Sequence, residues 1–146
     1  MVPICWNTNL FILMILNNMI TEDFISYETA KLLKGKGFNE CCYGYYYEPK
    51  HLSHNTFDIT NSELEEDSCS APTLQMAMKW LREVHRIHIS ITPLSFEDGI
   101  FWMYKTIKLW SDNNCSELHR SDSKVGFNTY EEACEAAIKY CLENLI

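Results

Sequence analysis

Hydrophobic and polar positions change their spacing near the middle of the chain. Over residues 72–85 the apolar side chains recur every three or four positions, which places them on one face of a helix. From Ile87 to Thr92 apolar and polar residues alternate, as in a half-buried strand, and Pro93 is expected to close that strand. This stretch therefore predicts an amphipathic helix that runs directly into a strand.

Two further segments carry the signals of helices. Residues 26–36 begin with Ser26 as an N-cap, and Phe38 is placed to pack back onto the end of this helix. Near the end of the chain, Thr129 and Glu132 form the T-x-x-E capping box of a helix with many small residues on its packing face. Because small residues allow close approach, we expect this last helix to dock on a sheet.

The strands are expected to be few and mainly antiparallel. Residues 41–47 read as an aromatic strand, and residues 100–110 carry large apolar groups on both faces, as in the interior of a sheet. Residues 95–99 join this second strand to the preceding one as a hairpin, and residues 124–127 are a candidate short edge strand.

Two polar segments are predicted to be loops. Residues 50–70 are acidic and lack periodicity, apart from a possible short strand at residues 57–59, and residues 111–123 are rich in turn formers. Together the pattern predicts an α+β domain over residues 19–146. In it, about three helices cover one face of a small, mainly antiparallel sheet of about three or four strands.

Residues 1–18 do not match the rest of the chain. They contain a seven-residue apolar run, far shorter than the roughly 20 residues of a membrane-spanning helix. Met19 looks like a natural start, so the preferred interpretation is a non-native upstream extension. A short apolar helix docked on the domain and a poor membrane anchor are the alternatives, and no membrane association is expected.

Charge and cysteine content narrow the possible partners. The formal net charge of −8 disfavours non-specific binding to phosphates and suits a protein that offers an acidic surface to a partner. The seven cysteines have neither zinc-ribbon nor C-x-x-C spacing, which indicates reduced thiols in an intracellular protein. Cys134 and Cys141 lie on the last helix, where we expect them to act as small buried hydrophobes.

Candidate metal ligands gather around the aromatic strand. Cys41, His51, His54 and Cys69 include one H-x-x-H pair and are ligand types that zinc prefers. If Cys41 and Cys42 lie in a strand they point to opposite faces, so only one of them can easily coordinate a metal. The alternative is one buried cysteine and two solvated histidines, and we expect no resident cofactor apart from this zinc hypothesis.

An aromatic sheet face is the candidate ligand-binding surface. Aromatic side chains stack on unpaired bases, and nearby lysines contact phosphates. The candidate residues are Tyr45, Tyr46, Tyr47, Trp102, Tyr104 and Lys105. The alternative is that these rings fill the core and pack one face of a sheet.

Three blocks of the sequence support a family resemblance. The blocks are SYETAKLLKGKGF, APTLQMAMKWLREVH and TYEEACEAAIKYCLENL. With them, residues 19–146 resemble a family of small uncharacterised proteins found in gut Bacteroidota and in their phages and mobile elements. The resemblance implies no activity and no catalytic residues. It implies an accessory protein in the cytoplasm of a bacterial host cell.

The leading prediction is a non-enzymatic interaction protein, such as a phage or mobile-element accessory factor that binds a host protein. It depends on the acidic balance, on the family context and on the lack of a recognisable catalytic motif in the sequence. Binding of nucleic acid or a nucleotide through the aromatic face is the second hypothesis. A zinc-binding protein or an enzyme is the third.

Overall fold

The computed structural model describes residues 22–47, 50–122, 124 and 126–146, so the predicted extension at residues 1–18 lies outside the described residues. Within this part of the chain, three α-helices, six strands and a short 3-10 turn confirm the α+β class. In order they are α2 (Tyr27–Gly35), β1 (Cys42–Tyr47), β2 (His51–Ile59), η1 (Asn61–Glu63), β3 (Cys69–Ala71), α3 (Leu74–His85), β4 (Ile87–Phe96), β5 (Gly99–Leu109), β6 (Cys115–Arg120) and α4 (Tyr130–Asn144).

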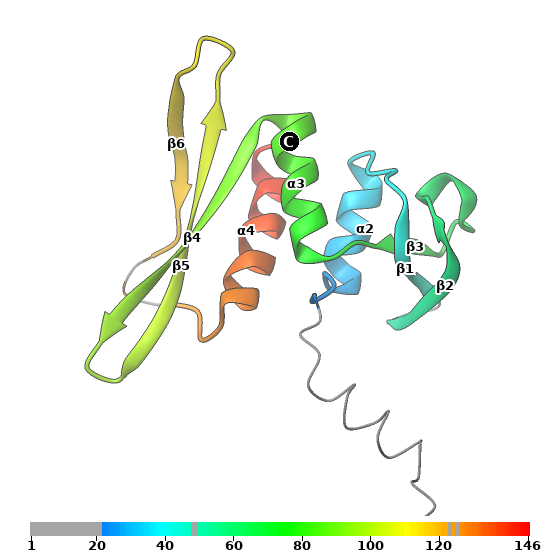
Figure 1. Cartoon of the computed structure of the whole chain (residues 1–146), viewed down its shortest axis with the longest axis horizontal. Coiled ribbons are helices and arrows are strands. Elements are labelled where there is room, and N and C mark those ends of the chain that lie inside the picture. The colour runs from blue at the N-terminus through cyan, green and yellow to red at the C-terminus, as the bar shows by residue number, and fades with distance from the viewer. Residues whose placement is uncertain (1–21, 48–49, 123, 125) are drawn as a thin grey trace, which may run out of the picture.

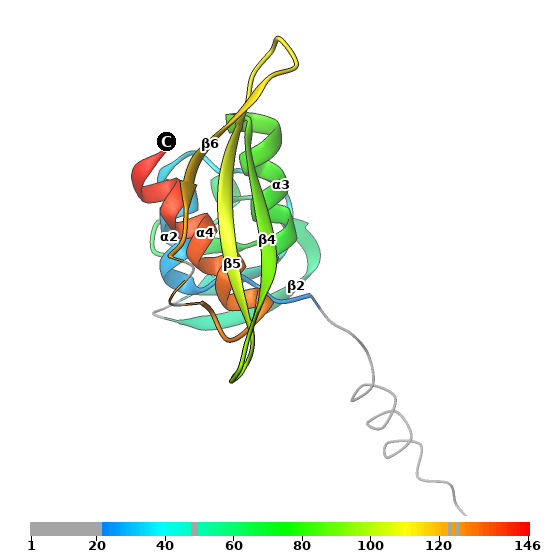
Figure 2. The same cartoon turned by 90° about the vertical axis from the view of Figure 1, so that its left-hand side faces the viewer.

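The strands form two antiparallel sheets rather than one. The first has the order β2-β1-β3 and the second the order β4-β5-β6. The three helices lie between these sheets in Figure 1. The sheet β4-β5-β6 lies in front of α3 and α4 in the side view of Figure 2, and its second face points away from the helices. The single sheet expected from the sequence is therefore divided between the two sides of a helical layer.

α2 and α4 begin directly after the predicted caps Ser26 and Thr129, and α3 begins directly after Thr73. The side-chain oxygens of Ser26, Thr73 and Thr129 accept hydrogen bonds from backbone N–H groups in the first turns of α2, α3 and α4. Cys134 and Cys141 are fully buried, as expected, and burial raises the pKa of the Cys141 thiol to about 12. Among the described residues, none of the helices has the length and apolar character that crossing a membrane requires.

The prediction of a loop over residues 50–70 was wrong, apart from the possible short strand at residues 57–59, which lies within β2. The segment contains β2, which pairs with one edge of β1, and β3, which pairs with the other. Ser53 and Ser70 both lie opposite Tyr45, so polar residues of these strands are ladder partners of an aromatic one. Polar residues give a weak strand signal because strand preference depends on cross-strand neighbours that the linear sequence does not identify.

Asn61 links the chain around this first sheet. Its side-chain amide donates to the Phe38 carbonyl at 2.7 Å, and its carbonyl oxygen accepts from the Ser70 N–H at 2.8 Å. Both hydrogen bonds are buried, and Asn61 itself is only 7% exposed. Through these two hydrogen bonds, Asn61 joins the segment that follows α2 to the strand β3.

We expect Asn61→Ala to lower the free energy of unfolding by about 2 kcal/mol, because a buried N–H and a buried carbonyl lose their partners. Urea unfolding followed by circular dichroism measures the change. Asn144→Ala is the matched control, since the Asn144 amide makes one exposed hydrogen bond to the Tyr140 carbonyl. Equal losses for the two variants would show that the buried bridge adds no stability.

Two predictions in the second half of the chain also require correction. Pro93 does not end β4, which continues to Phe96, and the expected turn region contains β6. Opposite Pro93, the Trp102 N–H and carbonyl both bond to Phe127, on the side of β5 away from β4. Pro93 is tolerated because β4 is an edge strand. Of the edge strand proposed at residues 124–127, the described residues 124, 126 and 127 show one bridge, between Phe127 and Trp102.

Candidate functional site

Alternate residues of β1 divide its tyrosines between the core and the surface. Tyr43, Tyr45 and Tyr47 point away from the helices, whereas Tyr46 points toward them. Tyr43 is 56% exposed and Tyr47 is 40% exposed, while Tyr45 is half-buried. We call Tyr43, Tyr45 and Tyr47, with the ring of His51 opposite Tyr47, the tyrosine face.

The rings of the tyrosine face contact one another at its surface. The Tyr45 and Tyr47 ring centroids are 6.1 Å apart, and the Tyr47 and His51 centroids are 5.6 Å apart. The Tyr43 ring lies 5.1 Å from that of His54. Strand β2 also carries two exposed apolar residues, but Leu52 pairs with Tyr46 and so lies on the other face of the sheet, whereas Phe57 is 80% exposed.

Two of the aromatic residues proposed as ligand contacts are in the core. Tyr46 is 8% exposed and its hydroxyl donates to the Ile25 carbonyl at 2.7 Å, and burial raises its pKa. Tyr104 is also buried, against the helices. These two rings cannot stack on a ligand in this structure.

The proposed platform that combined the two aromatic strands is not assembled. β1 and β5 belong to different sheets, and Figure 1 places those sheets on opposite sides of the helices. Trp102 is half-buried and packs edge-to-face on Tyr130 at 5.4 Å. Lys105 directly follows Tyr104 in β5, and successive residues of a strand face opposite sides, so Lys105 lies on the other face of the sheet. Of the predicted set, Tyr45 and Tyr47 remain together.

The four candidate metal ligands do not share one environment, because they differ in solvent exposure. Cys69 is buried and burial raises its pKa, whereas Cys41 is exposed. His51 and His54 pack against tyrosine rings. Across residues 22–47, 50–122, 124 and 126–146 there is no group of three or more metal-ligating side chains placed to hold an ion. The arrangement of these residues therefore gives the zinc hypothesis no support.

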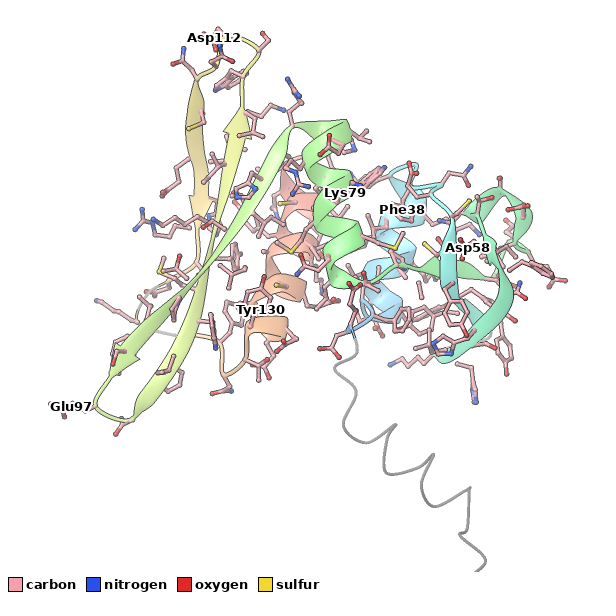
Figure 3. The ribbon with its side chains drawn as sticks, in the orientation of Figure 1. Phe38, Asp58, Lys79, Glu97, Asp112 and Tyr130 are labelled. Carbon is pink, nitrogen blue, oxygen red and sulfur yellow. The ribbon has the colours of Figure 1, made fainter. Side chains whose placement is uncertain are left out.

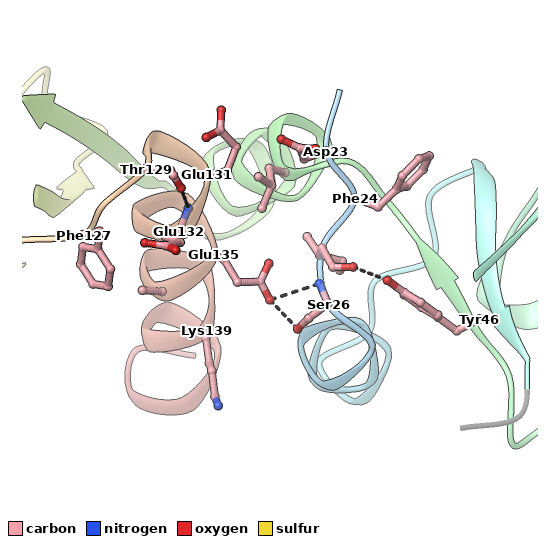
Figure 4. A pocket seen from close by; sticks show the side chains of 13 residues that line it. Asp23, Phe24, Ser26, Tyr46, Phe127, Thr129, Glu131, Glu132, Glu135 and Lys139 are labelled. Atoms are coloured by element: carbon pink, nitrogen blue, oxygen red, sulfur yellow. Dashed lines mark hydrogen bonds between the residues drawn. The ribbon is translucent and has the colours of Figure 1, made fainter. Parts of the chain in front are cut away.

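An acidic groove lies between the start of α2 and the first turns of α4 (Figure 4). Its volume is about 770 Å³ and it is open to solvent along one side. Its charged lining consists of four carboxylates and one ammonium group, those of Asp23, Glu131, Glu132, Glu135 and Lys139. Sequence analysis missed this groove because its walls come from segments more than 100 residues apart.

Glu135 is tied into the wall of the groove by hydrogen bonds. One of its carboxylate oxygens accepts from the Ser26 N–H at 3.2 Å, from the Ser26 hydroxyl at 2.5 Å and from the Thr29 hydroxyl at 2.5 Å. The carboxylate therefore sits at the N-terminus of α2, where the helix dipole favours negative charge. Figure 4 shows this contact between α4 and α2.

Comparisons with models of protein families, with curated proteins and with solved structures found no match to this chain. The resemblance to a Bacteroidota and phage family stays a prediction. A function for the chain must therefore be inferred from the surfaces that its own residues form.

Proposed function

We propose that this chain is a non-enzymatic interaction protein that binds a protein partner through the tyrosine face. The observation that carries the proposal is the row formed by exposed Tyr43 and Tyr47 with half-buried Tyr45, on a sheet face that none of the described helices covers. In the context suggested by the sequence, the protein is a phage or mobile-element accessory factor and its partner is a host protein.

The composition of the tyrosine face favours a protein ligand. Tyrosine is enriched at the energetic centres of protein interfaces because it buries a large ring and keeps a hydroxyl for hydrogen bonding. Within this face the Tyr45 and Tyr47 rings lie side by side, with centroids 6.1 Å apart. Together these residues supply apolar anchors next to polar groups, as interface cores require.

Single-stranded nucleic acid is the second candidate for the same face. The row formed by Tyr45, Tyr47 and His51 has the ring spacing of a surface on which bases could stack. Phosphate binding also requires cations, and the adjacent Lys50 ammonium lies 3.2 Å from the Glu28 carboxylate. The net charge of −8 opposes the approach of a polyanion, so we rank nucleic acid below protein.

We expect the double substitution Tyr43→Ser and Tyr47→Ser to abolish capture of a specific bacterial protein while leaving the fold intact, since both side chains are exposed. Chemical cross-linking and pull-down from a Bacteroides lysate, with quantitative mass spectrometry, measure the capture. We expect the amount of captured partner to fall at least about tenfold, because the variant lacks two interface anchors.

The matched control replaces two exposed aromatic residues of the other sheet, Phe96→Ser and Trp110→Ser. This variant should capture the same protein as the wild type. Loss of capture in both variants would contradict a specific role for the tyrosine face. A labelled single-stranded oligonucleotide that binds the wild type and fails to bind the tyrosine variant would instead favour the second candidate.

A further inference from the structure

The acidic groove between α2 and α4 combines an apolar floor with a negatively charged rim. Phe24, Leu74, Phe127 and Ala136 contribute apolar surface, and the rim carries the four carboxylates. The volume of about 770 Å³ is within the range of roughly 300–1,000 Å³ typical of ligand pockets. A ligand that fits both features must present apolar and cationic groups together.

The negative charge of the groove is not cancelled by the contacts that hold its carboxylates. Glu135 is held by the neutral groups of Ser26 and Thr29, and Glu132 accepts from the Asn128 N–H at 3.0 Å. The Lys139 ammonium, the one cation in the lining, lies 3.9 Å from the Glu143 carboxylate. The groove therefore keeps an excess of negative charge that a cationic ligand can neutralise.

We propose that this groove docks a basic, amphipathic polypeptide segment of a partner protein. Lysine and arginine side chains suit it because their methylene stems can cover Phe24 and Phe127 while their charged ends reach the rim. A polyanion would be repelled by the same carboxylates. The groove shares no residue with the tyrosine face, although the ring of its Phe24 lies 5.3 Å from the His54 ring, which contacts Tyr43.

A metal ion is a poorer match to the groove than a basic segment. A divalent cation needs several carboxylates that converge on one point, whereas no such group of three occurs among the described side chains. Asp23 precedes α2, and Glu131 lies in the first turn of α4, so these two carboxylates approach the groove from opposite walls. A long ligand can contact both walls at once.

The test uses a fluorescein-labelled lysine–leucine peptide of about 14 residues, whose leucines follow the spacing of one helix face. Its binding to the full chain is measured by fluorescence anisotropy at low ionic strength. We expect Asp23→Asn with Glu131→Gln to weaken binding at least about tenfold, since two charge contacts are lost. Both side chains are exposed, so the fold should not change.

The control removes two carboxylates that do not line the groove, with Glu97→Gln and Asp98→Asn between β4 and β5; Figure 3 shows Glu97 at the tip of this hairpin. This variant and the Tyr43→Ser, Tyr47→Ser variant should bind the peptide within about twofold of the wild type, as expected for distant sites. Serine in place of the peptide leucines should weaken binding, and glutamate in place of the lysines should abolish it.

Three results would overturn the proposal. The first is no binding of the lysine–leucine peptide. The second is equal weakening by the groove and hairpin variants, which would indicate non-specific attraction to net charge. The third is equally tight binding of the serine peptide, which would show that the apolar floor is not used. Failure of these peptide tests leaves the pull-down result for the tyrosine face unaffected.

Discussion

Phe38→Ala is expected to lower the free energy of unfolding by about 3–5 kcal/mol, as is typical when a large buried ring is truncated. Phe38 is 1% exposed, and its ring packs edge-to-face on Trp80 of α3 at a centroid distance of 5.5 Å. Its N–H bonds to the Leu33 carbonyl, so the residue also closes the C-terminus of α2. The substitution leaves a cavity between α2, α3 and the start of β1.

Urea unfolding, followed by both circular dichroism and tryptophan fluorescence, measures this loss. Tryptophan fluorescence is informative because Trp80 would lose its contact with the Phe38 ring. Phe96→Ala is the matched control, since Phe96 is 46% exposed at the β4–β5 turn; its expected loss is below about 1 kcal/mol. If both variants lost the same stability, Phe38 would not be the core contact that its burial indicates.

Glu135→Ala is expected to cost about 2–4 kcal/mol, because three donors at the start of α2 lose a charged acceptor. One of them is the hydroxyl of Thr29, a residue with no exposed surface. Glu135→Gln keeps an acceptor oxygen and should cost less than half as much. Thermal and urea unfolding measure the stability of the two variants. The difference between them separates the loss of the hydrogen bonds from the loss of the charge alone.

Glu143→Ala provides the control for this second prediction. Its carboxylate makes an exposed contact with Lys139 at 3.9 Å, and contacts of this kind contribute little stability. A loss as small for Glu135→Ala as for Glu143→Ala would contradict a structural role for Glu135. The expected result separates the two kinds of acidic residue in the groove: Glu135 joins α4 to α2, whereas Asp23 and Glu131 remain for a ligand.

The sequence by itself determined the helices and the two most hydrophobic strands. Local signals suffice for the helices, because the side chains of Ser26, Thr73 and Thr129 each accept a hydrogen bond from the backbone N–H three residues later. The predicted ligand-binding set placed Tyr45, Tyr46 and Tyr47 together, although alternation along a strand puts Tyr46 on the opposite face from the other two. These properties depend on neighbours in the chain and need no knowledge of the fold.

Only the tertiary structure decided which face of β1 is buried and which partners its edges find. The packing of Tyr46 toward Ile25 leaves Tyr45 and Tyr47 at the surface, and β2 and β3 are strands because they pair with β1. The acidic groove exists because Glu135 reaches Ser26 across 109 positions of the sequence. Such long-range contacts follow from the assembly of the whole core, so the hydrophobic pattern of any one segment cannot specify them.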